Sequence, residues 1–409
     1  MKAQLDHYRD IAPRGTVEFL RQLGRRVEGI HMLHVNSKRY GGHVAETVGC
    51  LVPLLEELGI TTRWEALDGT EPFDRTTKTF NHALQGSWQQ VTTEMYDVYQ
   101  ECNRANAQRL DLDADVVMIH DPQPAGLVDA RTSRSSWIWQ CHLNLSHPQR
   151  SVWDFLRSYV VRYDAAIVSL PQFAQRLPIP QFLVYPSIDP LSDKNREMGR
   201  EEVARILESL SIPRDKPILL QVSRFDQAKD PVGVLEAYRL IKKSHDCRLV
   251  LAGGTDINDA EGEDLLLELR NAASEDPDIH VLRLPPASDL EINALQRAAT
   301  IVFQKSTREG FGLPVAEALW KRKPVIGGEV GGITVQIIPG VTGYLANSAE
   351  GVAFYAKRLL NDTELMTNMG LHGREYARHR FLITRQLQEC LGLVIQLREA
   401  RHGNGARAA

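Results

Sequence analysis

The feature that most constrains the fold of this chain is an alternation, seen twice, between short apolar runs and longer segments with helical periodicity. The first series contains the apolar runs 30–35, 62–67, 115–119, 137–141, 165–169 and 181–185, and the second contains 218–222, 248–252, 280–284, 300–303 and 324–326. Each run has the length of a buried strand, and strands separated by helices form parallel sheets with helices on both faces. We therefore predict an α/β protein with two Rossmann-like, doubly wound parallel-sheet domains.

Length supports two domains, because 409 residues are too many for one ordinary core. We predict an N-terminal domain over residues 1–187 and a C-terminal domain over residues 188–375, with the junction in a turn-rich stretch. Residues 376–409 are expected to form a helix that packs back on the N-terminal domain and a disordered tail. Two domains of this kind that face a common cleft would hold a substrate there.

Composition excludes several classes of protein. A net charge of −4 gives no broad attraction to nucleic acid or to an anionic membrane. No apolar run approaches the ~18 residues of a spanning helix, and the first residues lack the layout of a signal peptide. Five scattered cysteines without a CxxC pair indicate reduced thiols of a cytoplasmic protein. Asp111 and Asp113 lead into a strand and are interpreted as solvated loop charges, so no metal site is expected.

The stretch 304–320, QKSTREGFGLPVAEALW, carries the most specific chemical signal. It predicts a strand end, a tight turn and a helix start. Gly310 and Gly312 let backbone N–H groups approach a ligand, and the first N–H groups of a helix attract an anion. Glu309 and Glu317 could accept hydrogen bonds from the paired hydroxyls of a sugar or a ribose. The combination favours a nucleotide sugar, although Glu317 could instead complement the helix dipole and Glu309 could be a solvated turn residue.

A second loop, SRFDQAKD at 223–230, places Arg224 and Lys229 between a predicted strand and a predicted helix. Two cations beside a helix start can clamp a diphosphate. If a diphosphate leaves a sugar, fixed cations would stabilise the charge that builds on its oxygens. Local pairing with Asp226 and Asp230 is the alternative, and the glycine turn after the later strand favours the clamp.

Polar residues also follow the predicted strands of the first domain. Asp121 and His142 stand at carboxyl ends of strands, where ligands gather in parallel sheets. We predict that they hold the hydroxyls of a sugar, while a structural role for a lone histidine stays open. The pair Gly41 and Gly42 follows the first strand, but alone it indicates a tight turn more often than a ligand loop.

These motifs carry a resemblance to a known family. The string from Glu309 to Glu317, with SRFDQAKD upstream and Gly343-Tyr344-Leu345 downstream, resembles the retaining glycosyltransferases of family 4, which have the GT-B fold. The strings LHVNS, GGHVAE, HDPQP, WQCHLNLS and INALQRA together are similar to those of the trehalose glycosyltransferring synthases. The resemblance covers about residues 5–395.

The resemblance implies transfer of glucose from a nucleoside diphosphate glucose to C1 of glucose, giving α,α-trehalose in an often reversible reaction. Glu309 would hold hydroxyls of the donor glucose, Glu317 the ribose diol, and Arg224 and Lys229 the diphosphate. The donor would also contact backbone amides, namely those of Gly310, Phe311, Gly312 and Leu313. Gly41 and Gly42 would contact the phosphates of the donor. Asp121 and His142 would contact the sugars.

Front-face attack is the usual explanation of retention in this family, so no protein nucleophile is expected. The nucleotide base would be held by backbone groups near Leu284, which leave the choice of base open. No tightly bound cofactor is expected, although Mg²⁺ could assist through the diphosphate. The resemblance also suggests a homodimer.

Five residues depart from the family pattern, and all lie in the first domain: Lys38, Arg39, His43, Gln140 and Asn144. The donor chemistry is therefore better supported than the identity of the acceptor. One hypothesis is that Lys38 and Arg39 admit a charged acceptor such as a sugar phosphate.

Two rival functions stay open. A retaining trehalose phosphorylase would use inorganic phosphate in place of the nucleoside diphosphate. A silent sugar-nucleotide binder is the alternative outside enzymes, and the presence of the whole set Arg224, Lys229, Glu309 and Glu317 argues against it.

Overall fold

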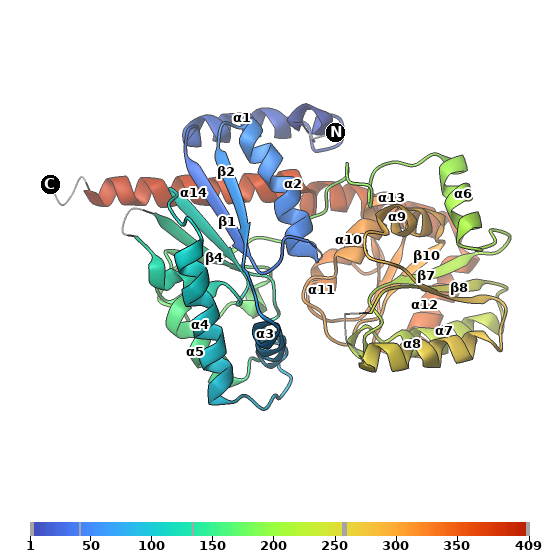
Figure 1. The fold of residues 1–409 in the computed structure, drawn as a ribbon. Helices are drawn as coiled ribbons and strands as arrows, with labels where there is room; N and C mark the ends of the chain where they lie inside the picture. Colours follow the sequence, from blue (N-terminus) through green and yellow to red (C-terminus); the bar gives the residue numbers. More distant parts are fainter. Residues whose placement is uncertain (1–3, 41, 133–134, 256–259, 406–409) are drawn as a thin grey trace. The chain divides into compact units, whose positions relative to one another are not determined.

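The structure is a computed structural model that describes residues 4–40, 42–132, 135–255 and 260–405. The chain divides into two compact units. Unit 1 comprises Met1–Pro186 and Ile383–Ala409, and unit 2 comprises Ser187–Leu382. Each unit is built on a six-stranded sheet flanked by helices (Figure 1). The prediction of two doubly wound α/β domains is confirmed.

The sheet of unit 1 is parallel throughout and has the order β2-β1-β3-β4-β5-β6. Its strands are β1 (His31–Asn36), β2 (Thr61–Ala66), β3 (Val116–His120), β4 (Ser136–Cys141), β5 (Ala165–Val168) and β6 (Gln181–Leu183). Strands β3, β4 and β5 are buried along their whole length because helices cover both faces. The chain changes direction across the sheet between β1 and β3, and ligands of open α/β sheets bind beside such a switch point.

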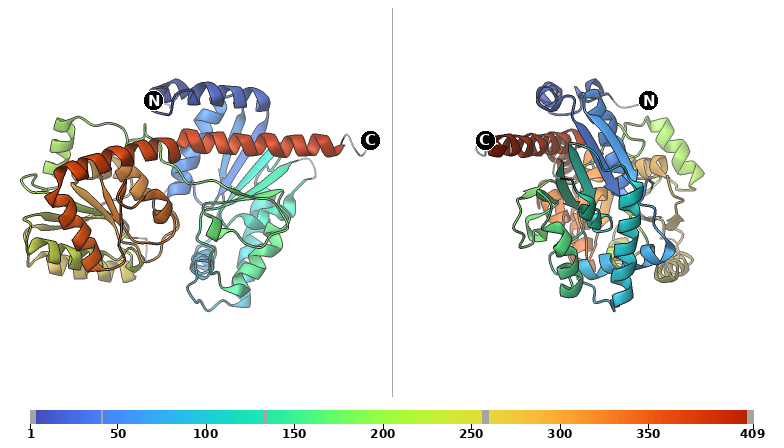
Figure 2. Two further views of the ribbon diagram at one scale, coloured as in Figure 1. Left: turned by 180° about the vertical axis from the view of Figure 1, so that it is seen from behind. Right: turned by 60° about the vertical axis from the view of Figure 1, so that its left-hand side comes forward.

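Six α-helices and three short 3₁₀ helices belong to the described part of unit 1. They are η1 (Leu5–Tyr8), α1 (Thr16–Val27), α2 (His43–Glu57), α3 (Glu71–Leu84), α4 (Thr93–Arg109), η2 (Ala125–Ala130), α5 (Arg150–Val160), η3 (Pro171–Phe173) and α14 (Ile383–Gly405). The last of them, α14, packs against α1 and α2 of the same unit (Figure 2). The predicted disordered tail is residues 402–409; residues 402–405 instead continue α14, and residues 406–409 lie outside the described residues.

The sheet of unit 2 is also parallel and has the order β12-β11-β10-β7-β8-β9. Its strands are β7 (Ile218–Val222), β8 (Arg248–Gly253), β9 (Ile279–Arg283), β10 (Ile301–Gln304), β11 (Val325–Gly327) and β12 (Gly343–Leu345). The switch point of this sheet lies between β7 and β10. The loops that leave these two strands are the ones in which the sequence predicts a diphosphate clamp and an anion-binding turn.

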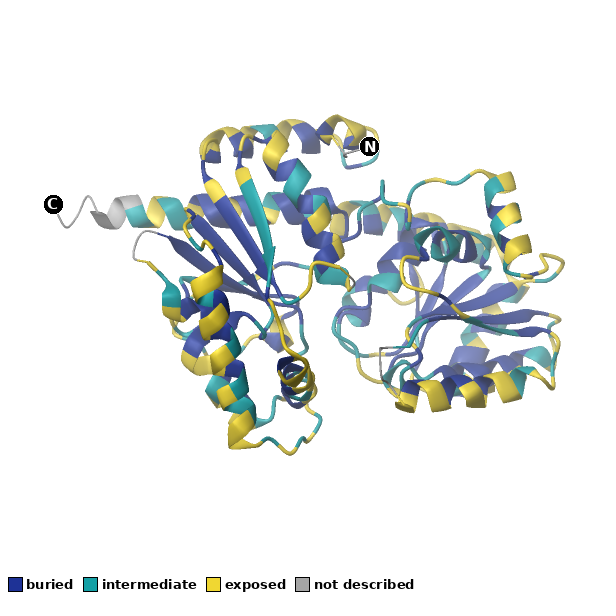
Figure 3. Cartoon of the chain, in the orientation of Figure 1, coloured by how far each residue is buried: buried dark blue, intermediate teal, exposed yellow. Residues whose placement is uncertain are grey.

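The helices of unit 2 cover both faces of its sheet and leave the outer helix surfaces exposed (Figure 3). They are α6 (Arg200–Ser209), η4 (Gln227–Lys229), α7 (Pro231–Lys242), α8 (Ala260–Ala273), α9 (Asp289–Ala298), α10 (Leu313–Trp320), α11 (Ile333–Gln336), α12 (Ala349–Asn361) and α13 (Thr363–Arg380). Gly253 ends β8 where the loop after β7 passes, and a Cβ there would lie 1.7 Å from the carbonyl oxygen of Ser223. Glycine therefore lets that loop turn close to the sheet.

The structure also bears on the expectations about the cysteines and about membrane-spanning helices. All five cysteines lie in the described residues, and none of them forms a disulfide there. In the ranges that the structure describes, no helix is both long enough and apolar enough to cross a membrane.

Candidate active site

The loop after β7 is held by its own carboxylates, which cap helices. Asp226 Oδ1 accepts a hydrogen bond from the backbone N–H of Ala228 at 2.7 Å, and Asp230 Oδ1 accepts one from that of Gly233 at 3.0 Å. Asp230 has a left-handed φ of 49° at the start of α7, a conformation that Asp tolerates better than most residues. Arg224 Nη2 lies 3.3 Å from Asp226 Oδ2 in an exposed pair, so Arg224 makes a local contact and still reaches solvent.

Lys229 pairs with a residue of the other predicted motif. Its Nζ donates to Glu309 Oε2 at 2.6 Å, and both side chains are largely buried, at 16% and 10% exposure. The same carboxylate oxygen accepts hydrogen bonds from Ser306 Oγ at 3.0 Å and from Gln304 Nε2 at 3.3 Å. Glu309 is thus no solvated turn residue. The two motifs that were recognised separately in the sequence meet at the switch point of the unit 2 sheet.

The turn between Glu309 and α10 is packed tightly against a second glycine loop. Gly312 is the N-cap of α10 and has a left-handed φ of 80°. The carbonyl oxygens of Gly310 and Phe311 accept hydrogen bonds from Gly332 N at 2.8 Å and Gln336 Nε2 at 2.6 Å. Protein donors therefore satisfy the carbonyls of the turn. The N–H groups that begin α10, from Leu313 onward, are of the kind that binds an anion.

Two further predicted donor-site residues lie in unit 2. Glu317 is one turn into α10 and is buried, with 6% exposure, and the alternative that it complements the helix dipole stays open. Leu284 follows β9 directly, and its backbone N–H donates to the carbonyl of Gly253 at 2.7 Å. Leu284 therefore lies at the carboxyl end of the sheet, as do the loops of the clamp.

A column of histidines stands at the carboxyl ends of β1, β3 and β4 in unit 1. His34 Nδ1 lies 3.0 Å from His120 Nε2, and His120 Nδ1 lies 3.4 Å from His142 Nε2. The neighbouring rings are stacked, with centroids 5.3 Å and 5.7 Å apart. The ring of His43 meets that of His142 edge-on at 5.0 Å. Sequence reasoning assigned no role to His34 or to His120, although both lie at or near the end of a predicted strand.

Burial keeps this column uncharged. It lowers the pKa of His34 and of His142 from 6.5 to about 4, and it lowers the pKa of His120 well below its ordinary value. The outer nitrogens of the column, His34 Nε2 and His142 Nδ1, are buried without a hydrogen-bond partner. The histidines contact one another in a row, and in the described ranges no group of three or more His, Cys, Asp or Glu side chains could hold a metal ion.

Asp121 and His142, which the sequence singles out, are neighbours. Asp121 Oδ1 accepts a hydrogen bond from the backbone N–H of His142 at 2.8 Å, and the backbone of Asp121 has a left-handed φ of 67°. Burial raises the pKa of the Asp121 carboxyl to about 6. The indole of Trp139 donates to the carbonyl oxygen of Asp121 at 3.0 Å and so fixes this unusual backbone. Polar groups suited to a sugar therefore lie together here.

The glycine loop before α2 is only partly described. Gly42 is the N-cap of α2 with a left-handed φ of 79°, and Gly41 lies outside the described residues. Both basic residues of this loop have partners in unit 1. Lys38 Nζ lies 3.5 Å from Asp74 Oδ2. The guanidinium of Arg39 stacks 4.5 Å above the ring of Trp64.

Two further residues that depart from the family pattern, Gln140 and Asn144, are at least partly buried. Gln140 is buried within β4. Asn144 Oδ1 accepts hydrogen bonds from the N and Oγ of Ser146, at 3.0 Å and 2.6 Å, so it shapes its own turn.

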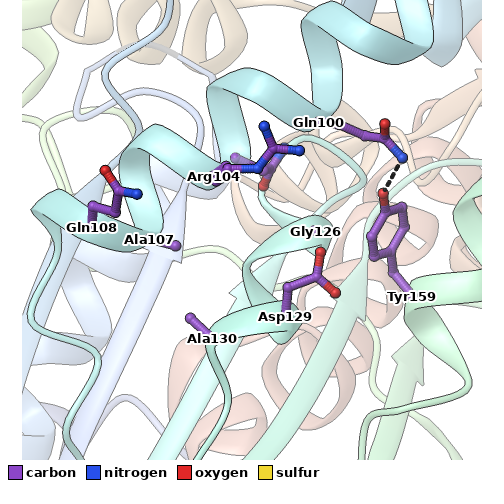
Figure 4. Close-up of a pocket in the computed structure, with 9 residues that line it drawn as sticks. Gln100, Arg104, Ala107, Gln108, Gly126, Asp129, Ala130 and Tyr159 are labelled. Carbon is purple, nitrogen blue, oxygen red and sulfur yellow. Dashed lines mark hydrogen bonds between the residues drawn. The ribbon is translucent and has the colours of Figure 1, made fainter.

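A separate pocket of about 320 Å³ opens in unit 1 among α4, η2 and α5 (Figure 4). Its lining consists of Gln100, Asn103, Arg104, Ala107, Gln108, Gly126, Asp129, Ala130 and Tyr159. Gln100 Nε2 donates to the hydroxyl of Tyr159 at 3.1 Å across it. None of the predicted site residues lines this pocket, so it is distinct from the candidate active site.

Comparison with known proteins covers both units. A family model for the N-terminal domain of trehalose synthase matches residues 34–175, and one for glycosyl transferases group 1 matches residues 203–376. The trehalose synthase of Pyrococcus horikoshii is 40% identical over 406 residues, which are 97% of each chain. A trehalose phosphorylase of Grifola frondosa is 28% identical over 91% of this chain and 58% of its own length.

A solved structure is similar at the level of the fold. It is an α,α-trehalose-phosphate synthase (UDP-forming) from Burkholderia xenovorans in complex with glucose-6-phosphate, with a TM-score of 0.69 and 14% sequence identity. The match covers 90% of this chain and 100% of that one. The similarity thus extends across both parallel sheets.

Proposed function

This chain belongs to the trehalose synthase family and is a glycosyltransferase with the GT-B fold, and from this premise we propose that it forms α,α-trehalose from a nucleoside diphosphate glucose and glucose. The reaction we propose proceeds with retention and is reversible. One observation carries the proposal: Lys229, a cation suited to a diphosphate, pairs at 2.6 Å with Glu309, a carboxylate suited to sugar hydroxyls. The diphosphate and the glucose of a nucleotide sugar would thus be recognised at the same place.

The donor would be held by unit 2. Arg224 and Lys229 would bind the diphosphate, with the N–H groups of the turn from Gly310 to Leu313 beside it. Glu309 would accept hydrogen bonds from the glucose hydroxyls, and Glu317 from the ribose diol. As the bond from the anomeric carbon to the diphosphate breaks, negative charge grows on the leaving oxygens. Fixed cations and backbone dipoles lower the barrier most at that point.

The glucose units would be contacted from unit 1 by His142 and Asp121. His142 Nδ1 is buried and unpartnered, and a sugar hydroxyl would satisfy it. The acceptor hydroxyl would attack the anomeric carbon from the face that the diphosphate leaves, and the leaving phosphate would take its proton. No nucleophile from the chain would then be needed. Gly42, and Gly41 beside it, would close over the donor phosphates.

Plain glucose is the acceptor we propose. Lys38 is paired with Asp74 and Arg39 is stacked on Trp64. A phosphorylated acceptor would have to draw both side chains from these contacts. The rival hypothesis of a charged acceptor makes the opposite prediction, so the choice is open to direct measurement.

The test crosses donors with acceptors. Uridine, adenosine and guanosine diphosphate glucose are each incubated with glucose or glucose 6-phosphate, with and without a chelator of Mg²⁺, and products are identified by NMR. We expect α,α-trehalose and a free nucleoside diphosphate, with Lys229→Met as the inactive control. Preference for glucose 6-phosphate would replace the proposed acceptor.

Two other outcomes would replace the proposed activity. Glucose 1-phosphate released from trehalose and phosphate without nucleotide would identify a phosphorylase. A rise in Tm with nucleoside diphosphate but no product from any pair would identify a silent binder. Light scattering on the same preparation tests the homodimer that we propose.

A further inference from the structure

Behind the buried carboxylate of Glu317 lies a second layer of polar residues. Gln296, in α9, is fully buried, and its Nε2 donates to Glu317 Oε2 at 3.0 Å. The other end of the same amide, Oε1, accepts a hydrogen bond from Lys321 Nζ at 2.6 Å. Lys321 is itself buried and donates to Asn195 Oδ1 at 2.8 Å. Gln296 belongs to the INALQRA string of the sequence, which has so far had no role.

The order of these groups sets the direction of the amide. An ammonium carries donors and no acceptor, whereas an amide has a donor end and an acceptor end. Lys321 therefore requires the oxygen of Gln296, and the NH₂ group must face Glu317. A flipped amide would place two donors face to face on one side and two acceptors on the other, at a buried site where unmet polar groups are costly.

This direction leaves one oxygen of Glu317 for a ligand. Oε2 is engaged by Gln296, and among the residues that the structure describes Oε1 makes no hydrogen bond to protein. The arrangement presents a fixed, charged acceptor, which is what a pair of adjacent hydroxyls requires.

We propose that Lys321 and Gln296 are positioning residues for donor recognition, which act by fixing Glu317 in the orientation that binds the nucleotide ribose. The inference rests on the proposed function, because it takes the ribose role of Glu317 as given. Neither Lys321 nor Gln296 is expected to touch the donor. Their effect should therefore depend on whether the ligand carries ribose hydroxyls.

The contacts from Lys321 through Gln296 to Glu317, here called the relay, should depend on pH because of the charges around Lys321. Burial lowers the pKa of Lys321 to about 7, against the opposing influence of Glu317 and Glu197, while Arg297 and Lys194 lower it further. Once Lys321 loses its proton, its amine can accept as well as donate, and the amide of Gln296 is no longer held in one direction. Donor affinity should then fall as the pH rises above 7.

The test compares ligands that differ only in the ribose hydroxyls. Calorimetry measures the affinity for uridine diphosphate and for its 2′,3′-dideoxy counterpart in wild type and in the double variant Gln296→Met/Lys321→Met. The double variant removes the amide and the ammonium together, so neither of them is left buried without the other. We expect about a tenfold loss of affinity for uridine diphosphate and less than about a twofold change for the dideoxy ligand.

A structural control is available in Asn195→Leu. Asn195 contacts Lys321 but makes no hydrogen bond to Gln296 or Glu317 in the described structure, so this change should lower Tm while the ribose preference persists. Equal losses for both ligands in the double variant, or no loss in a folded protein, would overturn the relay. A Glu317→Ala variant that keeps the full ribose preference would instead overturn the proposed role of Glu317 itself, so the two failures are distinguishable.

Discussion

The histidine column should make unit 1 lose stability on mild acidification. Burial lowers the pKa of His34 and of His142 from 6.5 to about 4, and that of His120 in the same direction. A group with a lower pKa in the folded state binds its proton more readily in the unfolded chain. The stability that these neutral rings contribute is therefore complete above pH 6.5 and is lost as the pH falls toward 4.

The size of the effect follows from these values. Between pH 7 and pH 5, a pKa lowered from 6.5 to about 4 removes about 1.85 kcal/mol of unfolding free energy for each of His34 and His142. Asp121 acts in the opposite direction, because a carboxyl pKa raised from 3.8 to about 6 adds about 1.3 kcal/mol over the same interval. The net loss is about 2.4 kcal/mol before the contribution of His120, which has the same sign as the other histidines.

Urea unfolding at pH 7, 6 and 5, followed by tryptophan fluorescence, measures this loss. Five of the six tryptophans, all except Trp320, belong to unit 1. The double variant His34→Gln/His142→Gln should flatten the pH dependence, and Asp121→Asn should steepen it toward a loss of about 3.7 kcal/mol. An unchanged unfolding free energy at pH 5 in wild type, or the same slope in the double variant, would refute the reasoning.

The remaining predictions concern unit 2. Lys229→Met should lower kcat by about 10²- to 10³-fold and reduce the unfolding free energy by about 3 kcal/mol, because it leaves the carboxylate of Glu309 buried without its ammonium. Arg224→Met, at a side chain 52% exposed, should lower kcat with less than about 0.5 kcal/mol change in stability. Steady-state kinetics and urea titration separate the two, and wild-type turnover in both variants would remove the clamp from the mechanism. Gly331→Ala would bring a Cβ within 2.1 Å of the carbonyl oxygen of Glu309 and should lower both Tm and kcat. Gly340→Ala is its control, since Gly340 also has a positive φ but open space around it, and equal effects of the two changes would show that crowding against Glu309 is irrelevant.

Much of the architecture could be predicted from patterns that depend on single segments. The alternation of apolar and amphipathic stretches predicted parallel sheets, and the strand order then brings the loops after β7 and β10 together. The meeting of Lys229 and Glu309 follows from that order. The stretch 71–109 forms two helices, α3 and α4, separated by residues 85–92. No proline marks that break, and a glycine at 86 is its clearest local signal.

Contacts between side chains of different strands or helices could not be predicted, because they depend on the register and packing of neighbouring elements. No single segment of the sequence encodes that register. Opposite His120 in β3 stands Gln140 of β4, so the contact between His120 and His142 crosses the sheet with an offset of two residues. The contact between Gln296 and Glu317 likewise joins side chains of two helices, α9 and α10. Polar residues inside apolar patterns were the available signal in both cases. Their partners could be named only once the packing was known.

The pairing of Lys229 with Glu309 also bears on which ligands the proposed donor site would accept. An isolated phosphate offers something to the ammonium and nothing to the carboxylate, and free glucose does the reverse. Either one would have to pull the opposite charges away from each other and leave one of them stranded. A molecule that carries both chemistries, an anion joined to a polyol, would satisfy the two at once, so at the proposed donor site the resting contact would favour the activated sugar over its fragments.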